Sequence, residues 1–193
     1  GWGGALVGSA TFANFTSQRC ATQWWGERLG ADPVRDGLAG LPRMPVLSGG
    51  YVHPSARKAL QMLGHGRDTV QVCAADAIGR VDLSALDSAL ADLAEPAVII
   101  GNAGEVNAGD FDPIDDLADI AERRGAWLHV DASFGIFAAL SPRSAHLVRG
   151  MERADSIAAD AHKWLNVPYE SGFVLIAEPQ RLGRAFGYPG APY

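Results

Sequence analysis

Short apolar segments alternate with helical segments along the whole chain, and this alternation restricts the fold more than any other feature. The helical segments are long enough to carry the chain back across a sheet between parallel strands. Apolar strands separated by such helices predict a mostly parallel sheet that is covered on both faces. We therefore expect an α/β fold with three layers, α/β/α. The apolar segments are residues 5–7, 46–48, 69–73, 97–100, 127–130, 156–159 and 173–176, and the predicted helices are residues 12–29, 54–63, 83–93 and 114–124.

The ends of the predicted helices carry residues that stop helices. Gly30, Gly64 and Gly125 each follow a helical segment, and glycine readily takes the left-handed conformation that ends a helix. A loop rich in proline and glycine covers residues 32–45. The chain has no internal repeat and no domain boundary, and 193 residues with 48% apolar content can form one buried core. We expect a single domain.

The charge and cysteine content restrict the partners and the compartment. The formal net charge is −6, which argues against nucleic acid or an anionic membrane as the main partner. No apolar run approaches the length of a membrane span. Cys20 and Cys73 are far apart and lack metal-ligand spacing, so we expect reduced thiols in a cytoplasmic protein.

Three polar segments follow apolar strands and should meet at one edge of the sheet. Asp131 comes directly after one strand, Lys163 lies just beyond another, and Gly8–Thr11 links residues 5–7 to the first helix. Open α/β sheets bind ligands at the carboxyl ends of their strands. The sequence therefore predicts a ligand site formed by these segments.

Lys163 is the most informative residue of that site. It lies in Ala161-His162-Lys163-Trp164-Leu165, and a lysine among apolar and aromatic neighbours needs a partner. A lysine amine forms a Schiff base with the aldehyde of pyridoxal phosphate (PLP). The alternative is a surface lysine whose stem covers apolar residues.

PLP makes two further demands that the sequence can meet. Its ring nitrogen needs a buried carboxylate, for which Asp131 is suited, although an aspartate after a strand also caps turns. Its phosphate suits a helix N-terminus such as Gly8–Thr11, although serine or threonine there is often only an N-cap. His53, at the start of a helix, could stack on the pyridine ring, whereas a lone histidine is more often structural.

The remaining candidates are interpreted as structural. His65, His129 and His146 are expected to be ordinary structural histidines, and Trp24–Trp25 are expected to pack a helix. Arg123–Arg124 are interpreted as a solvated helix end. The sequence contains no metal-ligand cluster, nucleophile elbow or Walker-type loop.

Five motifs in order give the chain a family resemblance. The motifs are Gly-Ser-Ala-Thr-Phe-Ala-Asn (8–14), Tyr-Val-His-Pro-Ser (51–55), Phe-Asp-Pro-Ile (111–114), Trp-Leu-His-Val-Asp-Ala-Ser-Phe (127–134) and residues 154–169. With these motifs the chain resembles the group II PLP-dependent amino acid decarboxylases, which include aromatic amino acid, glutamate and diaminobutyrate decarboxylases. The segment His-Lys-Trp-Leu-Asn-Val-Pro-Tyr is the most specific of the matches.

The resemblance implies the aspartate-aminotransferase-like fold, PLP fold type I, and a role for each matching residue. It implies that Lys163 bonds to PLP, that Asp131 pairs with the ring nitrogen, and that His53 stacks on the ring and assists catalysis. Ser133 would lie under the ring. The phosphate would be held by Ser9, Ala10 and Thr11, helped by Asp160 and His162.

The chain departs from the family pattern in sequence and in length. Glu105 and Val106 stand where many relatives have threonines that touch the cofactor, and Asp160 stands where some have asparagine. Family members are more than twice as long, with an N-terminal segment that helps dimerisation and a C-terminal small domain. We therefore expect residues 1–193 to be an incomplete PLP-binding large domain, whose end at 187–193 precedes the expected mobile catalytic loop.

The resemblance implies a PLP-dependent carboxy-lyase of amino acid metabolism. The expected reaction converts an L-amino acid to an amine and CO₂ through a Lys163 Schiff base, in a homodimer. Two alternatives stay open. One is another fold type I activity, namely an aldehyde synthase, an aminotransferase or a lyase; the other is a catalytically silent truncated relative.

Overall fold

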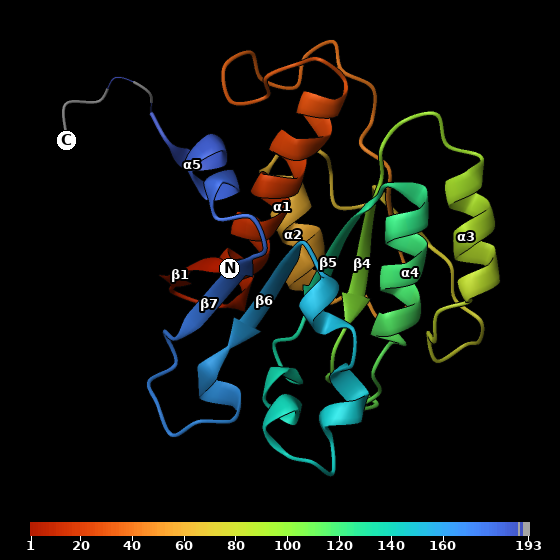
Figure 1. The fold of residues 1–193 in the computed structure, drawn as a ribbon, viewed down its shortest axis with the longest axis vertical. Helices are drawn as coiled ribbons and strands as arrows, with labels where there is room; N and C mark the ends of the chain where they lie inside the picture. Colours follow the sequence, from red (N-terminus) through yellow and green to blue (C-terminus); the bar gives the residue numbers. More distant parts are fainter. Residues whose placement is uncertain (189, 191–193) are drawn as a thin grey trace.

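The central feature of the fold is a seven-stranded sheet, seen in a computed structural model that describes residues 1–188 and 190 (Figure 1). The strand order is β1-β7-β6-β5-β4-β2-β3, and only β7 runs antiparallel to its neighbours. The predicted mostly parallel sheet is therefore confirmed. Pro189 and residues 191–193, the end of the predicted domain, lie outside the described residues. The strands are β1 (Gly3–Val7), β2 (Val46–Ser48), β3 (Val70–Val72), β4 (Val98–Asn102), β5 (Trp127–Asp131), β6 (Ser156–Asp160) and β7 (Gly172–Ile176).

The four predicted helices are present, with ends that differ by no more than two residues from those expected. The first helix begins earlier than predicted because Ser9 has an extended backbone and its Oγ accepts a hydrogen bond from the amide of Phe12. A fifth helix and several 3₁₀ helices were not predicted, because segments this short show no clear periodicity. The helices are α1 (Ala10–Arg28), α2 (Pro54–Met62), α3 (Leu83–Ala91), α4 (Ile114–Arg124) and α5 (Gln180–Phe186), with 3₁₀ helices η1 (Ile136–Leu140), η2 (Ala145–Val148), η3 (Met151–Arg153) and η4 (Ala161–Lys163).

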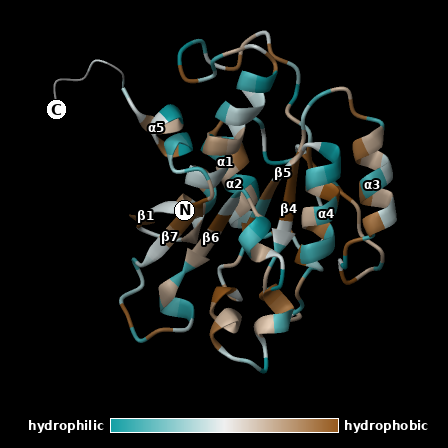
Figure 2. Cartoon of the chain, viewed as in Figure 1, coloured by the Kyte–Doolittle hydropathy of each residue, from teal (hydrophilic) through white to brown (hydrophobic). Residues whose placement is uncertain are grey.

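The sheet separates two apolar clusters, which makes the fold three-layered as expected. Alternate residues of a strand face opposite sides, so Val98 and Ile100 pack toward α1, α2 and α5, whereas Ile99 packs toward α3 and α4. The central strands carry the hydrophobic colour in Figure 2, and the visible face of α4 is largely hydrophilic. Trp24 and Trp25 are buried in the α1 cluster, so the prediction that they pack a helix is confirmed.

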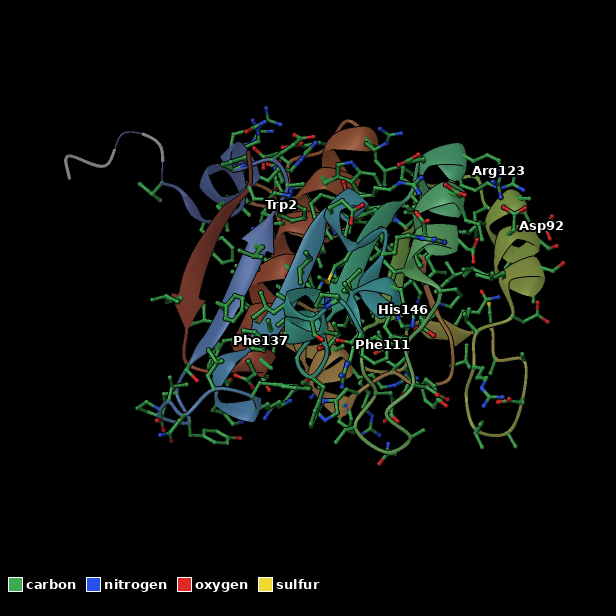
Figure 3. The ribbon with its side chains drawn as sticks, turned by 60° about the horizontal axis from the view of Figure 1, so that its bottom comes forward. Trp2, Asp92, Phe111, Arg123, Phe137 and His146 are labelled. Atoms are coloured by element: carbon green, nitrogen blue, oxygen red, sulfur yellow. The ribbon has the colours of Figure 1, made fainter. Side chains whose placement is uncertain are left out.

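The arginines at the end of α4 are both exposed, as expected of a solvated helix end. Arg123 and Arg124 both bond to Asp87 of α3, with nitrogen–oxygen distances of 3.1 Å for Arg123 and 2.8 Å for Arg124. Figure 3 shows Arg123 on the helix that lies beside α3. The sequence did not indicate this pairing, because it depends on an acidic residue of the neighbouring helix.

Leu117 of α4 offers a test of the core. It is 1% exposed and lies against Gly101 of β4, so Leu117→Ala should lower the free energy of unfolding by about 2–5 kcal/mol. Leu140→Ala is the matched control, because Leu140 is 79% exposed and its truncation should change stability by no more than about 0.5 kcal/mol. Urea unfolding followed by tryptophan fluorescence measures both. Equal losses for the two variants would contradict this assignment of the core.

Candidate active site

The carboxyl ends of the central strands form one edge of the sheet, and each of the three middle strands ends there in a polar residue. These residues are Asn102 of β4, Asp131 of β5 and Asp160 of β6. Asn102 and Asp131 lie side by side in the strand register. Figure 3 turns this edge toward the viewer, with Phe111 of the loop after β4 labelled. The predicted convergence of polar groups therefore takes place at this edge.

A pocket opens at this edge and contains four of the predicted residues. Lys163, Asp131, His53 and Ser133 all line it, although they come from four separate segments of the chain. The other lining residues are Tyr51, Asn102, Gly104, Glu105, Val106 and Phe134.

Lys163 reaches the pocket from the end of η4, and its side chain is 19% exposed. Its Nζ lies 4.4 Å from the centroid of the Phe134 ring and 3.9 Å from Asp160 Oδ2. The flanking Trp164 and Leu165 are 61% and 44% exposed, so they do not shield the lysine. The partial burial of Lys163 therefore comes from the pocket wall and not from the residues beside it in the sequence.

Asp131 lies at the base of the pocket with both carboxylate oxygens bonded. Oδ1 accepts hydrogen bonds from Ser133 Oγ at 2.6 Å and from the Ser133 amide at 3.2 Å. Oδ2 accepts one from Asn14 Nδ2 at 3.0 Å. Asp131 therefore caps the turn that follows β5, and it also lines the pocket. Three donors therefore surround this buried carboxylate.

His53 is the N-cap of α2 and lies at the mouth of the pocket, where it is exposed to solvent. Its Nδ1 accepts a hydrogen bond from the Ser55 amide at 3.2 Å and lies 2.7 Å from Ser55 Oγ. Because Nδ1 accepts, the neutral ring carries its proton on Nε2. The contacts with Ser55 thus fix the orientation of the ring.

The predicted phosphate-holding residues lie beside the pocket rather than in its lining. Ser9 lies against Gly172, where an added Cβ would be 2.4 Å from the Ser9 carbonyl carbon. Gly172 pairs with Asp160 in the sheet, and Ser171 Oγ accepts a hydrogen bond from the His162 amide at 3.0 Å. Segment 171–172 therefore joins Ser9, Ala10 and Thr11, at the start of α1, to Asp160 and His162.

Two buried polar atoms in this group have no hydrogen-bond partner among the described residues. They are Asp160 Oδ1 and His162 Nδ1, which lie 3.4 Å apart without hydrogen-bond geometry. Buried polar atoms are normally paired, so these atoms indicate room for a further polar group. The amides that begin α1 also lack acceptors within the helix and favour an anion.

Sequence reasoning missed part of the pocket wall. Tyr51 was given no role, yet it lines the pocket and its hydroxyl donates to Asp110 Oδ2 at 3.0 Å. Phe134 was quoted only as part of a motif. Glu105 and Val106 were named only as departures from the family pattern, and both line the pocket. The position of these two residues just beyond β4, at the same edge as Asp131, was the signal available in the sequence.

The residues of this edge fit PLP by their chemistry. Lys163 offers an amine for the aldehyde, and Asp131 offers a buried carboxylate for the ring nitrogen. His53 offers a flat ring at the mouth of the pocket. The start of α1 and the unpaired atoms of Asp160 and His162 offer polar groups for the phosphate.

Comparisons with known proteins agree with this chemistry. A family model described as pyridoxal-dependent decarboxylase conserved domain matches residues 3–189. Acidic amino acid decarboxylase GADL1 of Mus musculus is 34% identical over 170 residues, which are 86% of the chain and 31% of the relative. Aromatic-L-amino-acid decarboxylase of Bacillus atrophaeus is 32% identical over 187 residues, which are 95% of the chain and 37% of the relative. The chain thus spans about a third of the length of these curated relatives.

Solved structures show the same similarity in three dimensions. The structure of mouse CSAD in apo form has a TM-score of 0.88 and 29% identity, and the match covers 100% of the chain and 41% of the CSAD chain. The structure of Oryza sativa TDC with PLP and tryptamine has a TM-score of 0.83 and 27% identity, and the match covers 100% of the chain and 40% of the TDC chain. The expected fold type I architecture is confirmed by these neighbours.

Proposed function

The chain belongs to the pyridoxal-dependent decarboxylase family, and from that membership we propose that it is the PLP-binding large domain, residues 1–193, of an amino acid decarboxylase. The proposed reaction converts an L-amino acid to an amine and CO₂. One observation carries the proposal: Lys163 and Asp131 line the same pocket. Lys163 suits the aldehyde of the cofactor, and Asp131 suits its ring nitrogen.

Lys163 is proposed as the residue that bonds to the cofactor aldehyde. When bound, PLP supplies an electron sink for the electron pair left behind as CO₂ departs. The Nζ of Lys163 lies over the Phe134 ring and near the Asp160 carboxylate, and these contacts hold it at the pocket wall. The amine must lose a proton before it bonds, and Asp160 lies close enough to influence that step.

Asp131 is proposed to hold a proton on the ring nitrogen of the cofactor. Its carboxylate is buried and accepts hydrogen bonds from Ser133 and Asn14, which hold it in place. A buried carboxylate pairs strongly with a cationic ring nitrogen because little water screens the interaction. Ser133, at the same wall, is proposed to lie under the ring.

His53 and the phosphate-holding residues complete the proposal. His53 is proposed to cover the ring and to assist catalysis through its Nε2 proton, with Ser55 fixing its orientation. Ser9, Ala10 and Thr11 are proposed to hold the phosphate at the start of α1. Asp160 and His162 have buried atoms free to complete this group within the described part of the chain.

A homodimer and a cytoplasmic location are further parts of the proposal. Exposed apolar side chains follow the lysine segment, including Trp164, Leu165 and Tyr169, and such a patch supports burial against a second subunit. Cys20 and Cys73 are both free, which supports a reducing compartment. Among the described residues, no helix has the length and apolar character needed to cross a membrane.

The reaction is tested by product analysis on the whole protein. Protein loaded with PLP is incubated with acidic and aromatic L-amino acids, because relatives with both kinds of name are similar to the chain. Release of CO₂ together with an equal amount of the amine supports the proposal. Formation of an aldehyde, a keto acid or a cleaved side chain instead would identify another fold type I reaction. Absence of any product from every substrate would support a silent relative.

Gly172 tests the proposed phosphate site. Gly172→Ala places a methyl group against the Ser9 backbone, which should displace the start of α1 and weaken PLP binding at least about tenfold. Gly183→Ala is the matched control, because its new Cβ meets no atom within 4 Å and it lies inside α5. The control should bind PLP normally and gain about 0.5–1 kcal/mol of stability. Equilibrium titration with PLP decides, and unchanged binding by Gly172→Ala would remove Ser9–Thr11 from the proposed site.

A further inference from the structure

His129 is a buried titratable residue that the proposed reaction does not use. It lies in the middle of β5, is 0% exposed, and has both ring nitrogens bonded. Its Nε2 lies 2.8 Å from Asn14 Oδ1, and its Nδ1 lies 2.9 Å from Ser156 Oγ. Asn14 in turn bonds to Asp131. A single side chain therefore separates this histidine from the carboxylate at the base of the pocket.

The orientation of the Asn14 amide follows from its other neighbours. Its Nδ2 lies 3.1 Å from the Ala10 carbonyl oxygen and 3.0 Å from Asp131 Oδ2. The Ala10 carbonyl can only accept, so the amide group facing it must be the NH₂. The carbonyl oxygen of Asn14 therefore faces His129.

The proton positions of the remaining groups follow in turn. Because Asn14 Oδ1 can only accept, His129 Nε2 must carry a proton and donate it. Burial lowers the pKa of His129 to about 4, so the ring is neutral at physiological pH and Nδ1 is an acceptor. The Ser156 hydroxyl must then donate to Nδ1, while it accepts from Trp127 Nε1 at 3.0 Å. In all four hydrogen bonds the donor is therefore the residue nearer Trp127, in the order Trp127, Ser156, His129, Asn14 and Asp131. We call this series of hydrogen bonds the His129 relay.

We propose that His129 and Asn14 are positioning residues that fix the charge and orientation of Asp131 toward the cofactor. The proposal rests on the proposed function, because it gives Asp131 the role of partner to the ring nitrogen. A reversed Asn14 amide would direct its oxygen at Asp131 Oδ2, which only a protonated Asp131 could tolerate. The proton on His129 Nε2 and the negative charge on Asp131 therefore support each other. The interpretation of His129 as an ordinary structural histidine is replaced by this role.

The relay is tested first by NMR on the parent protein without cofactor. Selective ¹⁵N labelling of histidine reports which ring nitrogen carries the proton, and His129→Gln identifies the His129 signals by their loss. We expect neutral His129 with the proton on Nε2. A proton on Nδ1, or a charged ring at neutral pH, would overturn the proposal whether or not the protein decarboxylates anything.

Variants then test the effect on the cofactor. His129→Leu removes the donor to Asn14 and should weaken PLP binding about tenfold, and it should also change the visible absorption band of bound PLP, which reports the state of the ring. His129→Gln keeps an NH₂ donor and should retain the parent band and bind within about threefold of the parent. Ser156→Ala is a milder change, and it replaces His129→Leu if that variant does not fold. Its PLP affinity should be lower than that of His129→Gln, but reduced by less than about tenfold from the parent.

His65→Leu is the matched control for loss of a neutral histidine. The pKa of His65 is also lowered to about 4 by burial, and its Nε2 lies 2.9 Å from Thr22 Oγ1, in a separate part of the core. This variant should leave the bound PLP spectrum unchanged. If His129→Leu and Ser156→Ala bind PLP with the parent's affinity and spectrum, the relay has no role in the site. If instead the parent itself does not bond PLP at Lys163, the proposed function fails, and the role proposed for His129 fails with it. The proton position on His129 would still stand as a separate result.

Discussion

Replacing Lys163 with alanine should abolish covalent retention of PLP by the whole protein and lower decarboxylation at least about 10³-fold. The expected size follows from the loss of the nucleophile, since variants that lack a covalent catalyst lose most of the rate enhancement. Lys163 is the lysine that lines the pocket, and its Nζ is held there by Phe134 and Asp160. The measurement is borohydride reduction of the PLP-loaded protein, followed by peptide mass spectrometry.

The chain offers a matched control for this experiment, because Lys58 is its one other lysine. Lys58 lies exposed on α2, outside the pocket lining. Lys58→Ala should keep the covalent label on the Lys163 peptide and keep full activity. Recovery of labelled peptide from the Lys163→Ala protein at the parent's level would falsify the assignment of Lys163.

Replacing Asp131 with asparagine should lower the turnover number about 10²–10³-fold while PLP remains covalently attached at Lys163. Asparagine keeps the size of the side chain and removes its charge, so the ring nitrogen of bound cofactor would lose the partner that holds its proton. The hydrogen bonds that Asp131 accepts from Ser133 and Asn14 depend on the same charge, so weaker PLP binding is expected as well. Steady-state kinetics and the visible spectrum of bound PLP provide the two measurements.

Asp155 supplies the control for the removal of a buried carboxylate. It accepts a hydrogen bond from the Leu128 amide at 2.8 Å, and burial raises its pKa to about 6. It precedes β6 and therefore lies at the opposite edge of the sheet from the pocket. Asp155→Asn should leave turnover unchanged. Equal losses for the two variants would mean that the effect of Asp131→Asn reflects general damage to the core.

The sequence predicted the sheet well because its strands are apolar on both faces, but it could not give the direction of every strand. An apolar run such as residues 173–176 has the same pattern in either direction, so the reversal of β7 was not recognised. The connection between Asp160 and Gly172 contains only the short η4 and no crossover helix, which was the available signal. Helix α5 was missed because seven residues show too little periodicity.

The site was predicted where residues follow strands and was missed where loops meet. Asp131, Ser133 and Lys163 lie at or just beyond strand ends, so the topology alone places them at one edge. Tyr51 and Phe134 reach the pocket through the packing of separate loops, which spacing along the chain does not encode. The orientation of the hydrogen bonds around His129 could not be predicted either. It depends on the backbone carbonyl of Ala10, and no side-chain motif indicates that contact.

The pairing of β1 with β7 has a consequence for the order in which the protein folds. β1 lies at the edge of the sheet and, among the described residues, pairs with β7 alone, so it must await a strand made much later along the sequence. Contacts between segments so distant in sequence form slowly, since the loop that joins them must first close. The start of α1, which follows β1, can therefore reach its place beside Gly172 only after the rest of the sheet has been made. On the ribosome, the lysine side of the pocket would exist before its phosphate side, which needs both the start of α1 and Gly172.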